Sequence, residues 1–328
     1  MTASASKKWV VLATGGTIAG LAADVSVASN YQAAQVGAAD LLAQWGLAMS
    51  GQVVVDQVAQ VDSKDMNDAL WRTVLRRCQH WRDQADVAGV VLTHGSDTLE
   101  ETAFLLHWLL PQGCPVVLTG AMLPSNAPNT DGPDNLRLAL DWLDSGHAQG
   151  VSVAFGGHIL HPEWLTKSHA DRLSAFTSGD CAPLAIRHDQ SWILGDKPKT
   201  LRSMWRRPRL EDALAQPDWP RVEVFMHHAQ AQPWWLAPEV LAHQPGTTLK
   251  GVVLAATGHG TFNEAWQVAL SKLAEEGVQV AISSRCAFST VWPSSQHAGW
   301  FYSDHLNAVK TRLALQMTCL AQEVDVRR

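Results

Sequence analysis

Short apolar segments alternate with helical patterns along most of this chain, and this alternation limits the folds open to it. Five segments of the first half are rich in β-branched residues and bounded by Gly, Asp or Pro, as buried strands are: 9–13, 53–58, 87–93, 115–119 and 151–155. Helical patterns lie between them at 66–81, 99–110 and 133–143. Alternation of this kind predicts a mostly parallel sheet that helices cover on both faces.

A second set of strands and helices follows a stretch of weak periodicity. Four prolines and scattered charges interrupt residues 193–221, as in an interdomain linker. Beyond it, strands are predicted at 222–226, 251–256 and 278–283, with a helix at 262–276 and a C-terminal helix whose apolar stripe runs from Leu306 to Leu320. A chain of 328 residues that is 46% hydrophobic is long enough for two domains. We therefore predict an α/β fold with a larger N-terminal domain (1–195) on a doubly wound, mostly parallel sheet, a linker (196–221), and a smaller C-terminal α/β domain (222–328) with a parallel sheet.

The charge balance gives no support for a nucleic-acid partner, because 25 basic residues stand against 31 acidic ones. One segment, Arg202–Arg209, is basic, and with Pro208 inside it we interpret it as part of a solvated linker. The five cysteines are widely spaced and form no Cys-x-x-Cys pair, which disfavours structural zinc and a dithiol redox site. We expect no metal and no organic cofactor.

The sequence predicts a cytoplasmic location. Reduced, mostly buried cysteines suit that compartment. Lys7 and Lys8 precede an apolar run of only five residues, 9–13, which is too short for the core of a signal peptide. No apolar stretch is long enough to cross a bilayer, so we expect no membrane partner.

Polar residues follow four of the predicted strands at the point where each strand ends. In open parallel sheets, ligands bind beyond the carboxyl ends of the strands. These segments are Thr14-Gly15-Gly16-Thr17-Ile18-Ala19-Gly20, 62–68, 94–102 and 120–125. The first could be a dinucleotide-binding loop, but Thr17 stands where the G-x-G-x-x-G pattern needs a glycine, which disfavours a nucleotide-binding dehydrogenase.

The segment at 94–102 also fits the start of a helix. Ser96 or Asp97 is expected to cap that helix, and Glu100 would favour its positive end. A cap region can also hold an anion or a positioned carboxylate, so this role does not exclude chemistry. For His94, a structural role is favoured over a metal or base role, because no second ligand lies nearby in the sequence.

Together these segments resemble the bacterial L-asparaginase family of threonine amidohydrolases. The resemblance runs in order through Thr14–Gly20, Ser63–Asp68, His94–Thr102 and Gly120–Leu136, and continues more weakly through Gly258-His259-Gly260 and Ser283-Ser284-Arg285. It implies hydrolysis of L-asparagine to L-aspartate and ammonia through a threonine acyl-enzyme. It also implies a homotetramer, a dimer of dimers with sites shared between subunits.

The resemblance implies a catalytic role for five residues. Thr17 matches the nucleophile, and Tyr31 matches the tyrosine that hydrogen-bonds it. Ser96, Asp97 and Lys167 match a second polar triad, in which Ser96 replaces the usual threonine, Asp97 binds the substrate α-amino group and Lys167 sits behind. A threonine hydroxyl needs a nearby base or relay, and this cluster could supply one if Lys167 is partly desolvated.

The same resemblance implies a substrate-binding role for Gly16, Ser63, Lys64, Ser96, Asp97 and Ala121. Ser63 matches a residue that holds the substrate α-carboxylate, and Ala121 matches a position whose backbone carbonyl faces the substrate amide. Backbone N–H groups of the glycine turn and of the helix start at Ser96 could hold the oxyanion. Lys64 stands where the secreted enzymes usually have glutamine, and its charge would strengthen carboxylate binding while repelling the substrate ammonium.

Two further departures from the family bear on the substrate. His259 replaces an asparagine that the neighbouring subunit supplies in many relatives, and residues 286–296 contain no acid where glutamine-using relatives place a glutamate. We therefore expect asparagine to be preferred over glutamine. The alternatives are an amidase of the same fold for glutamine or another small amide, and a catalytically weakened relative that binds an amino acid.

Overall fold

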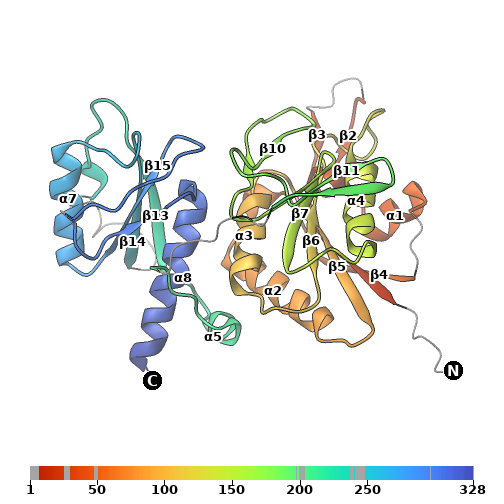
Figure 1. The fold of residues 1–328 in the computed structure, drawn as a ribbon, viewed down its shortest axis with the longest axis horizontal. Helices are drawn as coiled ribbons and strands as arrows, with labels where there is room; N and C mark the ends of the chain where they lie inside the picture. The colour runs from red at the N-terminus through yellow and green to blue at the C-terminus, as the bar shows by residue number, and fades with distance from the viewer. Residues whose placement is uncertain are drawn as a thin grey trace. The chain divides into compact units, whose positions relative to one another are not determined.

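The computed structural model describes residues 7–25, 30–47, 51–196, 198, 204–236, 240, 248–295 and 297–327. It divides into two compact units, one up to Pro198 and one from residue 199 onward (Figure 1). Each unit is built on its own sheet, which confirms the predicted α/β class. None of the described helices is both long enough and apolar enough to cross a membrane.

An eight-stranded sheet forms the centre of the first unit, in the order β12-β11-β8-β7-β6-β5-β1-β4. Its parallel part holds the five predicted strands: β1 (Lys8–Gly15), β4 (Gln52–Val61), β5 (Val87–Thr93), β6 (Val116–Thr119) and β7 (Val151–Phe155). Three antiparallel strands extend it: β8 (His158–Leu160), β11 (Ala185–His188) and β12 (Ser191–Leu194). Val90, Val91 and Leu92 are all fully buried. Strand β5 is therefore apolar at consecutive positions because both of its faces are covered.

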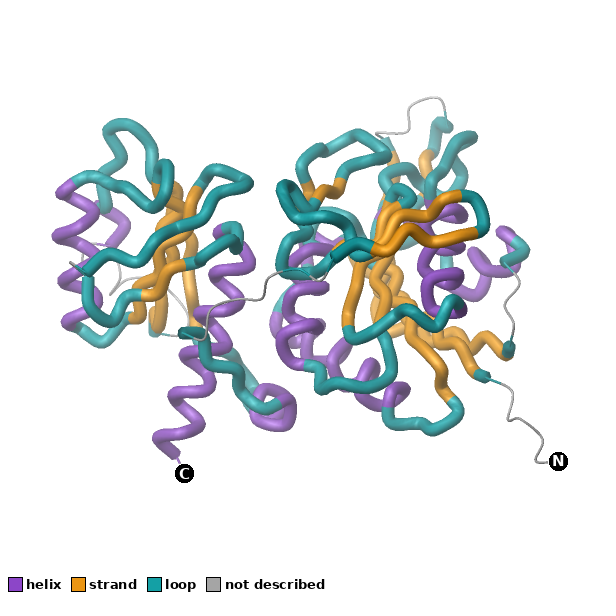
Figure 2. The backbone as a smooth tube through the Cα atoms, viewed as in Figure 1, coloured by secondary structure: helices purple, strands orange, loops and turns teal. Residues whose placement is uncertain are grey.

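Four helices cover this sheet: α1 (Ala38–Trp45), α2 (Asp68–Arg82), α3 (Leu99–Leu109) and α4 (Gly132–Asp144). Leu136 and Leu140 of α4 pack with Trp9 and Val91 of the strands, and Trp45 of α1 joins the same cluster. Helices α2 and α3 lie on the opposite face (Figure 2). The sheet is thus doubly wound, as predicted, and its polar strand ends lie at one edge.

Two short antiparallel ladders stand beside the carboxyl edge of the large sheet. One pairs β2 (Leu21–Ala22) with β3 (Tyr31–Gln32), and the other pairs β9 (Thr166–Lys167) with β10 (Phe176–Thr177). Single 3₁₀ turns follow β1 and β4, namely η1 (Thr17–Ala19) and η2 (Ser63–Asp65). These small elements carry five of the residues to which the resemblance gives a role: Thr17, Tyr31, Ser63, Lys64 and Lys167.

The second unit contains a four-stranded parallel sheet of β13 (Arg221–Met226), β14 (Leu249–Ala256), β15 (Gln279–Ser284) and β16 (Phe301–Tyr302). Val252 and Leu254 pack with Trp266 of α7 (Glu264–Glu275) on one face. On the other face Gly251 lies against Leu315 of α8 (Ala308–Arg327). Residues 313–321 of α8 are all buried, so burial extends beyond the predicted apolar stripe and includes the polar Gln316 and Thr318.

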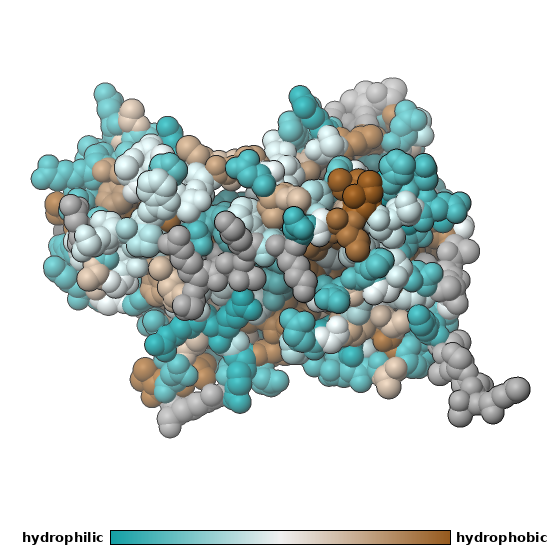
Figure 3. Space-filling model, in the orientation of Figure 1, coloured by the Kyte–Doolittle hydropathy of each residue, from teal (hydrophilic) through white to brown (hydrophobic). Residues whose placement is uncertain are grey.

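From residue 204 onward, the predicted linker is part of the second unit. It contains α5 (Leu210–Ala215), buries Trp205 and Trp219, and bonds the Trp219 indole to Ala213 O at 2.9 Å. Its arginines at 206, 207 and 209 are exposed, as expected of a solvated segment, whereas Arg202 lies outside the described residues. The limits predicted for the two domains and the linker stay a prediction. Hydrophilic side chains predominate on the face drawn in Figure 3.

Candidate active site

A glycine turn at the end of β1 brings the carboxyl ends of β1 and β5 together. Gly15 and Gly16 have φ of +103° and +81°, a region that favours glycine. A Cβ on Gly16 would lie 2.3 Å from the Cα of Gly95, in the loop after β5. Two backbones therefore approach each other where side chains would keep them apart. The Gly16 N–H donates to Val61 O at 2.9 Å, so this N–H serves the fold and is not a free oxyanion donor.

The loops after β4 and β6 join the same assembly. A Cβ on Gly95 would lie 2.6 Å from Ser63 Oγ, and one on Gly120 would lie 2.4 Å from His94 O. Thr98 Oγ1 donates to Ser63 O at 2.8 Å. The carboxyl ends of four adjacent parallel strands thus meet at one place, as the sequence predicts.

Thr17 and Tyr31 form a hydroxyl pair at this edge. Thr17 is buried, Tyr31 is half-buried, and their hydroxyl oxygens are 2.6 Å apart. Gly20 makes room for the phenol, because a Cβ there would lie 2.8 Å from Tyr31 Cδ2. The two hydroxyls therefore share a hydrogen bond along which a proton could pass.

Lys167 reaches from β9 to Ser96 and Asp97 at the start of α3. Its Nζ lies 2.9 Å from Ser96 Oγ and 2.6 Å from Asp97 Oδ1. The Lys167 side chain is 13% exposed and that of Asp97 is 60% exposed. The structure thus brings this predicted triad together, with its carboxylate toward solvent and its ammonium largely enclosed.

The prediction that Ser96 or Asp97 caps α3 was wrong. Thr98 occupies the cap position, and its hydroxyl makes no cap bond to the helix. Ser96 and Asp97 are bonded by Lys167 instead, a partner 70 residues away that a local motif does not show. Glu100, expected at the positive helix end, is buried, and its Oε1 lies 3.4 Å from Lys167 N.

Ser63 and Lys64 present different faces of the turn after β4. Ser63 is only 2% exposed, yet its Oγ has no hydrogen-bond partner among the described residues. Such a group calls for an explanation, and a polar ligand atom provides one. Lys64 is exposed and its ammonium pairs with Asp65, with Asp62 at 3.9 Å. The bond to Asp65 raises the pKa of Lys64.

Ala121 lies in a loop that a buried carboxylate holds in place. The N–H groups of Met122 and Leu123 donate to Asp131 at 3.0 Å, and Asn135 Nδ2 donates to Gly120 O at the same distance. Burial raises the pKa of Asp131, while these hydrogen bonds oppose that shift. The backbone on both sides of the fully buried Ala121 is thereby fixed.

His94 belongs to a closed hydrogen-bond chain. Its Nδ1 lies 2.8 Å from Gly95 O and its Nε2 lies 3.0 Å from Thr102 Oγ1, which accepts from the Trp71 indole at 2.9 Å. Both ring nitrogens are occupied, and burial lowers the pKa of His94 to about 4. This is a structural role, as favoured above. Across the described ranges, no cluster of three or more His, Cys, Asp or Glu could hold a metal.

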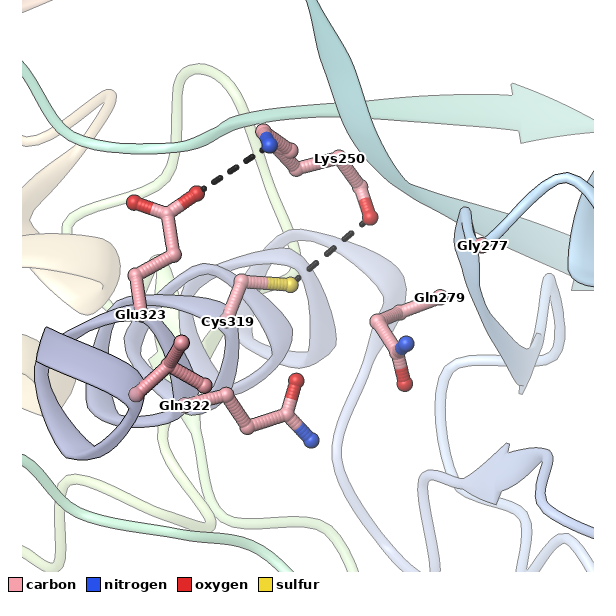
Figure 4. A pocket seen from close by; sticks show the side chains of 7 residues that line it. Lys250, Gly277, Gln279, Cys319, Gln322 and Glu323 are labelled. Atoms are coloured by element: carbon pink, nitrogen blue, oxygen red, sulfur yellow. Dashed lines mark hydrogen bonds and ion pairs between the residues drawn. The ribbon is translucent and has the colours of Figure 1, made fainter.

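A cavity of about 380 Å³ in the second unit is a weaker candidate (Figure 4). Among the residues that line it, Lys250 pairs with Glu323 at 3.3 Å, and the Cys319 thiol donates to Lys250 O at 3.8 Å. Burial raises the pKa of Cys319 to about 12, so the sulfur is a thiol and a poor nucleophile. The first unit therefore carries the better site.

His259 lies in the second unit, after β14. Its ring is exposed and stacks on Trp292, with centroids 4.3 Å apart and an angle of 5° between the planes. The role that the resemblance gives it in a neighbouring subunit stays a prediction.

Comparisons with known proteins show which family the two units resemble. The family model described as Asparaginase, N-terminal, matches residues 8–199, and Glutaminase/Asparaginase C-terminal domain matches residues 221–328. L-asparaginase 2 of Escherichia coli is 31% identical and covers 96% of this chain and 89% of its own length. Glutaminase-asparaginase of Pseudomonas fluorescens is 32% identical, covering 96% and 87%. The crystal structure of a probable cytoplasmic L-asparaginase from Campylobacter jejuni superposes with a TM-score of 0.82 at 27% identity, covering 95% and 94%.

Proposed function

The chain belongs to the asparaginase and glutaminase family, and from this premise we propose that it hydrolyses L-asparagine to L-aspartate and ammonia through an acyl-enzyme on Thr17. The chain is a hydrolase of amide bonds, with relatives named for asparagine and glutamine. The observation that carries the proposal of asparagine as substrate and Thr17 as nucleophile is the Thr17–Tyr31 hydroxyl pair, 2.6 Å apart, directly after a glycine turn.

The nucleophile in this proposal is Thr17 Oγ1. As it attacks the amide carbon, its proton passes to the Tyr31 oxygen, with which it shares a hydrogen bond, while the phenol proton passes on to the amide nitrogen, so Tyr31 stays neutral. The C–N bond then breaks, the nitrogen leaves as ammonia, and the aspartyl group stays as an ester on Thr17. Water attacks the ester carbon, one of its protons returns to the Thr17 oxygen as the ester bond breaks, and aspartate is released.

The substrate backbone would be held by groups on the neighbouring loops. Ser63 Oγ, buried and without a described partner, suits the α-carboxylate. Asp97 keeps one carboxylate oxygen for the α-ammonium while the other bonds Lys167. Since the Gly16 N–H is engaged by Val61, we place the oxyanion at the N–H groups that follow it in the turn and at the start of α3.

Ammonia release from L-asparagine and L-glutamine tests the proposal in wild-type protein and the Thr17→Ala variant. We expect asparagine turnover that Thr17→Ala abolishes, and a quenched intermediate with the aspartyl group on the Thr17 peptide. Thr14→Val is the matched control, because Thr14 loses a hydrogen bond to Thr93 O but lies on the other side of the turn. Turnover that survives in Thr17→Ala would remove the nucleophile from the proposal.

The alternative is another small amide in the same site. Lys64 favours it, because a cation beside Ser63 disfavours a substrate ammonium, although Asp62 and Asp65 already offset much of that charge. Clearly better turnover on glutamine than on asparagine would make glutamine the preferred substrate. An absence of turnover on both amino acids would favour a different amide or a weakened relative that only binds.

We also propose a cytoplasmic homotetramer, a dimer of dimers without a cofactor. The relatives include one named cytoplasmic and one named periplasmic, so cell fractionation decides the location. Light scattering of the purified protein measures the mass of the assembly.

A further inference from the structure

Asn126, in the loop between β6 and α4, holds the backbone of Ala22 with both ends of its side-chain amide. Ala22 N donates to Asn126 Oδ1 at 2.9 Å, and Asn126 Nδ2 donates to Ala22 O at 2.8 Å. The preceding residue holds the chain just before this strand: Ser125 N and Ser125 Oγ donate to Gly20 O at 2.9 and 2.8 Å. Two bonds from one planar amide to one residue fix both the position and the tilt of that backbone.

Ala22 is the cross-strand neighbour of Tyr31. The β2–β3 ladder pairs Ala22 with Tyr31 and Leu21 with Gln32, and Tyr31 carries the hydroxyl that lies 2.6 Å from Thr17. A ladder of two-residue strands has little stability of its own. On the far side of Tyr31 the chain is already tied down, because Ala34 N donates to Gly16 O at 3.1 Å and Gln60 Nε2 to Ala34 O at 2.7 Å.

We propose that Asn126 is a positioning residue for the reaction: by clamping Ala22 it sets the Tyr31 hydroxyl against Thr17. The inference rests on the proposed function, since it gives Asn126 an effect only through the Thr17–Tyr31 pair. Ala22 is buried, but Asn126 is exposed, so water can take the place of the Asn126 amide against the Ala22 N–H and C=O, and its removal lowers stability little. Its effect falls on chemistry, because Tyr31 contacts the nucleophile.

The test compares Asn126→Ala with Asn129→Ala, an exposed asparagine of the same loop. We expect Asn126→Ala to lower kcat about tenfold, the scale of one to two net hydrogen bonds, with KM changed less than kcat. Asn129→Ala should match the wild type. Asn126→Asp keeps an acceptor for Ala22 N but sets a carboxylate against Ala22 O, so we expect its kcat to fall as much as that of Asn126→Ala.

A double-mutant cycle with Tyr31→Phe separates positioning from a general structural role. If Asn126 acts through the tyrosine hydroxyl, Asn126→Ala should cost little further in the Tyr31→Phe background. Additive losses, or an unchanged kcat in Asn126→Ala, would overturn the inference.

Hydrogen exchange of a peptide covering residues 19–25 supplies a readout without substrate. It should be faster in Asn126→Ala and unchanged in Asn129→Ala, because the Ala22 N–H loses its acceptor. If the wild type releases no ammonia, the proposed function fails, and exchange alone still decides whether Asn126 clamps Ala22. Unchanged exchange in Asn126→Ala would contradict the clamp in either case.

Discussion

At the scale of single residues, Lys167 holds the second polar triad together. One ammonium nitrogen lies within hydrogen-bond distance of both Ser96 and Asp97 while its side chain is largely enclosed. Removing it leaves a carboxylate without its counter-charge and a buried serine hydroxyl without its donor.

We predict that Lys167→Met lowers kcat for asparagine by about a hundredfold or more, the scale of losing a general acid–base group. Steady-state ammonia release measures it. Ser96→Thr keeps a hydroxyl at the same place and is the control, expected within about tenfold of the wild type. A Lys167→Met variant that retains a third of the wild-type kcat would contradict a catalytic role for the triad.

His94 makes a separate prediction about stability and pH. Its folded pKa is lowered to about 4, whereas the ring titrates near 6.5 when unfolded. Between those values the unfolded chain holds a proton that the folded protein lacks, so the free energy of unfolding falls as pH drops from 6.5 to 4. The loss from this residue reaches about 3 kcal/mol, and its contribution is fully present above pH 6.5.

Urea unfolding at several pH values between 4 and 7.5 checks this. His94→Gln should be less stable at pH 7 but show a shallower decline toward pH 4, because it removes the titrating group. If the free energy of unfolding fell equally steeply with pH in the wild type and in His94→Gln, residues other than His94 would dominate acid unfolding.

At the scale of elements, the site depends on loops that touch backbone to backbone. Gly16 combines a left-handed φ with a Cβ position 2.3 Å from Gly95 Cα, whereas Gly46, after α1, has φ +58° with open space around it. Gly46→Ala should therefore cost about 1 kcal/mol from its backbone conformation alone. Gly16→Ala adds a clash that only movement of a strand end relieves.

We predict that Gly16→Ala lowers the free energy of unfolding by roughly 3 kcal/mol or more and abolishes amide hydrolysis. Urea unfolding of both variants gives the comparison. Equal stabilities for Gly16→Ala and Gly46→Ala would mean that the close approach of the two loops is not tight.

Elements also show how far sequence reasoning reaches. The parallel strands were predictable because strands such as 90–92 are buried on both faces and read as unbroken apolar runs. The β2–β3 and β9–β10 ladders were not, because two-residue strands leave no periodicity. The contacts of Thr98, Glu100 and Asn126 were missed for the same kind of reason: they join segments far apart in the chain, and no local pattern marks them.

At the scale of the whole molecule, the second unit exposes large apolar side chains along the carboxyl edge of its sheet. Met226 ends β13, and Phe288 and Trp292 follow β15; they are 65%, 48% and 60% exposed. Trp292 also stacks on His259, which follows β14. Large apolar side chains exposed to solvent can mark a protein contact. If the tetramer proposed above forms, we expect the partner to be a second copy of this chain.

We predict that Trp292→Asp weakens assembly, because a carboxylate would have to be desolvated in a contact that would otherwise bury an indole. Light scattering should give a smaller mass than the wild type at the same concentration, and ammonia release should fall more steeply on dilution. The control is Val268→Asp, which places the same charge on an exposed apolar position of α7, away from this edge. If both variants keep the wild-type mass and dilution profile, the edge is not a subunit contact. In that case His259 has no neighbouring site to complete, and the asparagine preference expected from residues 259 and 286–296 loses its structural basis.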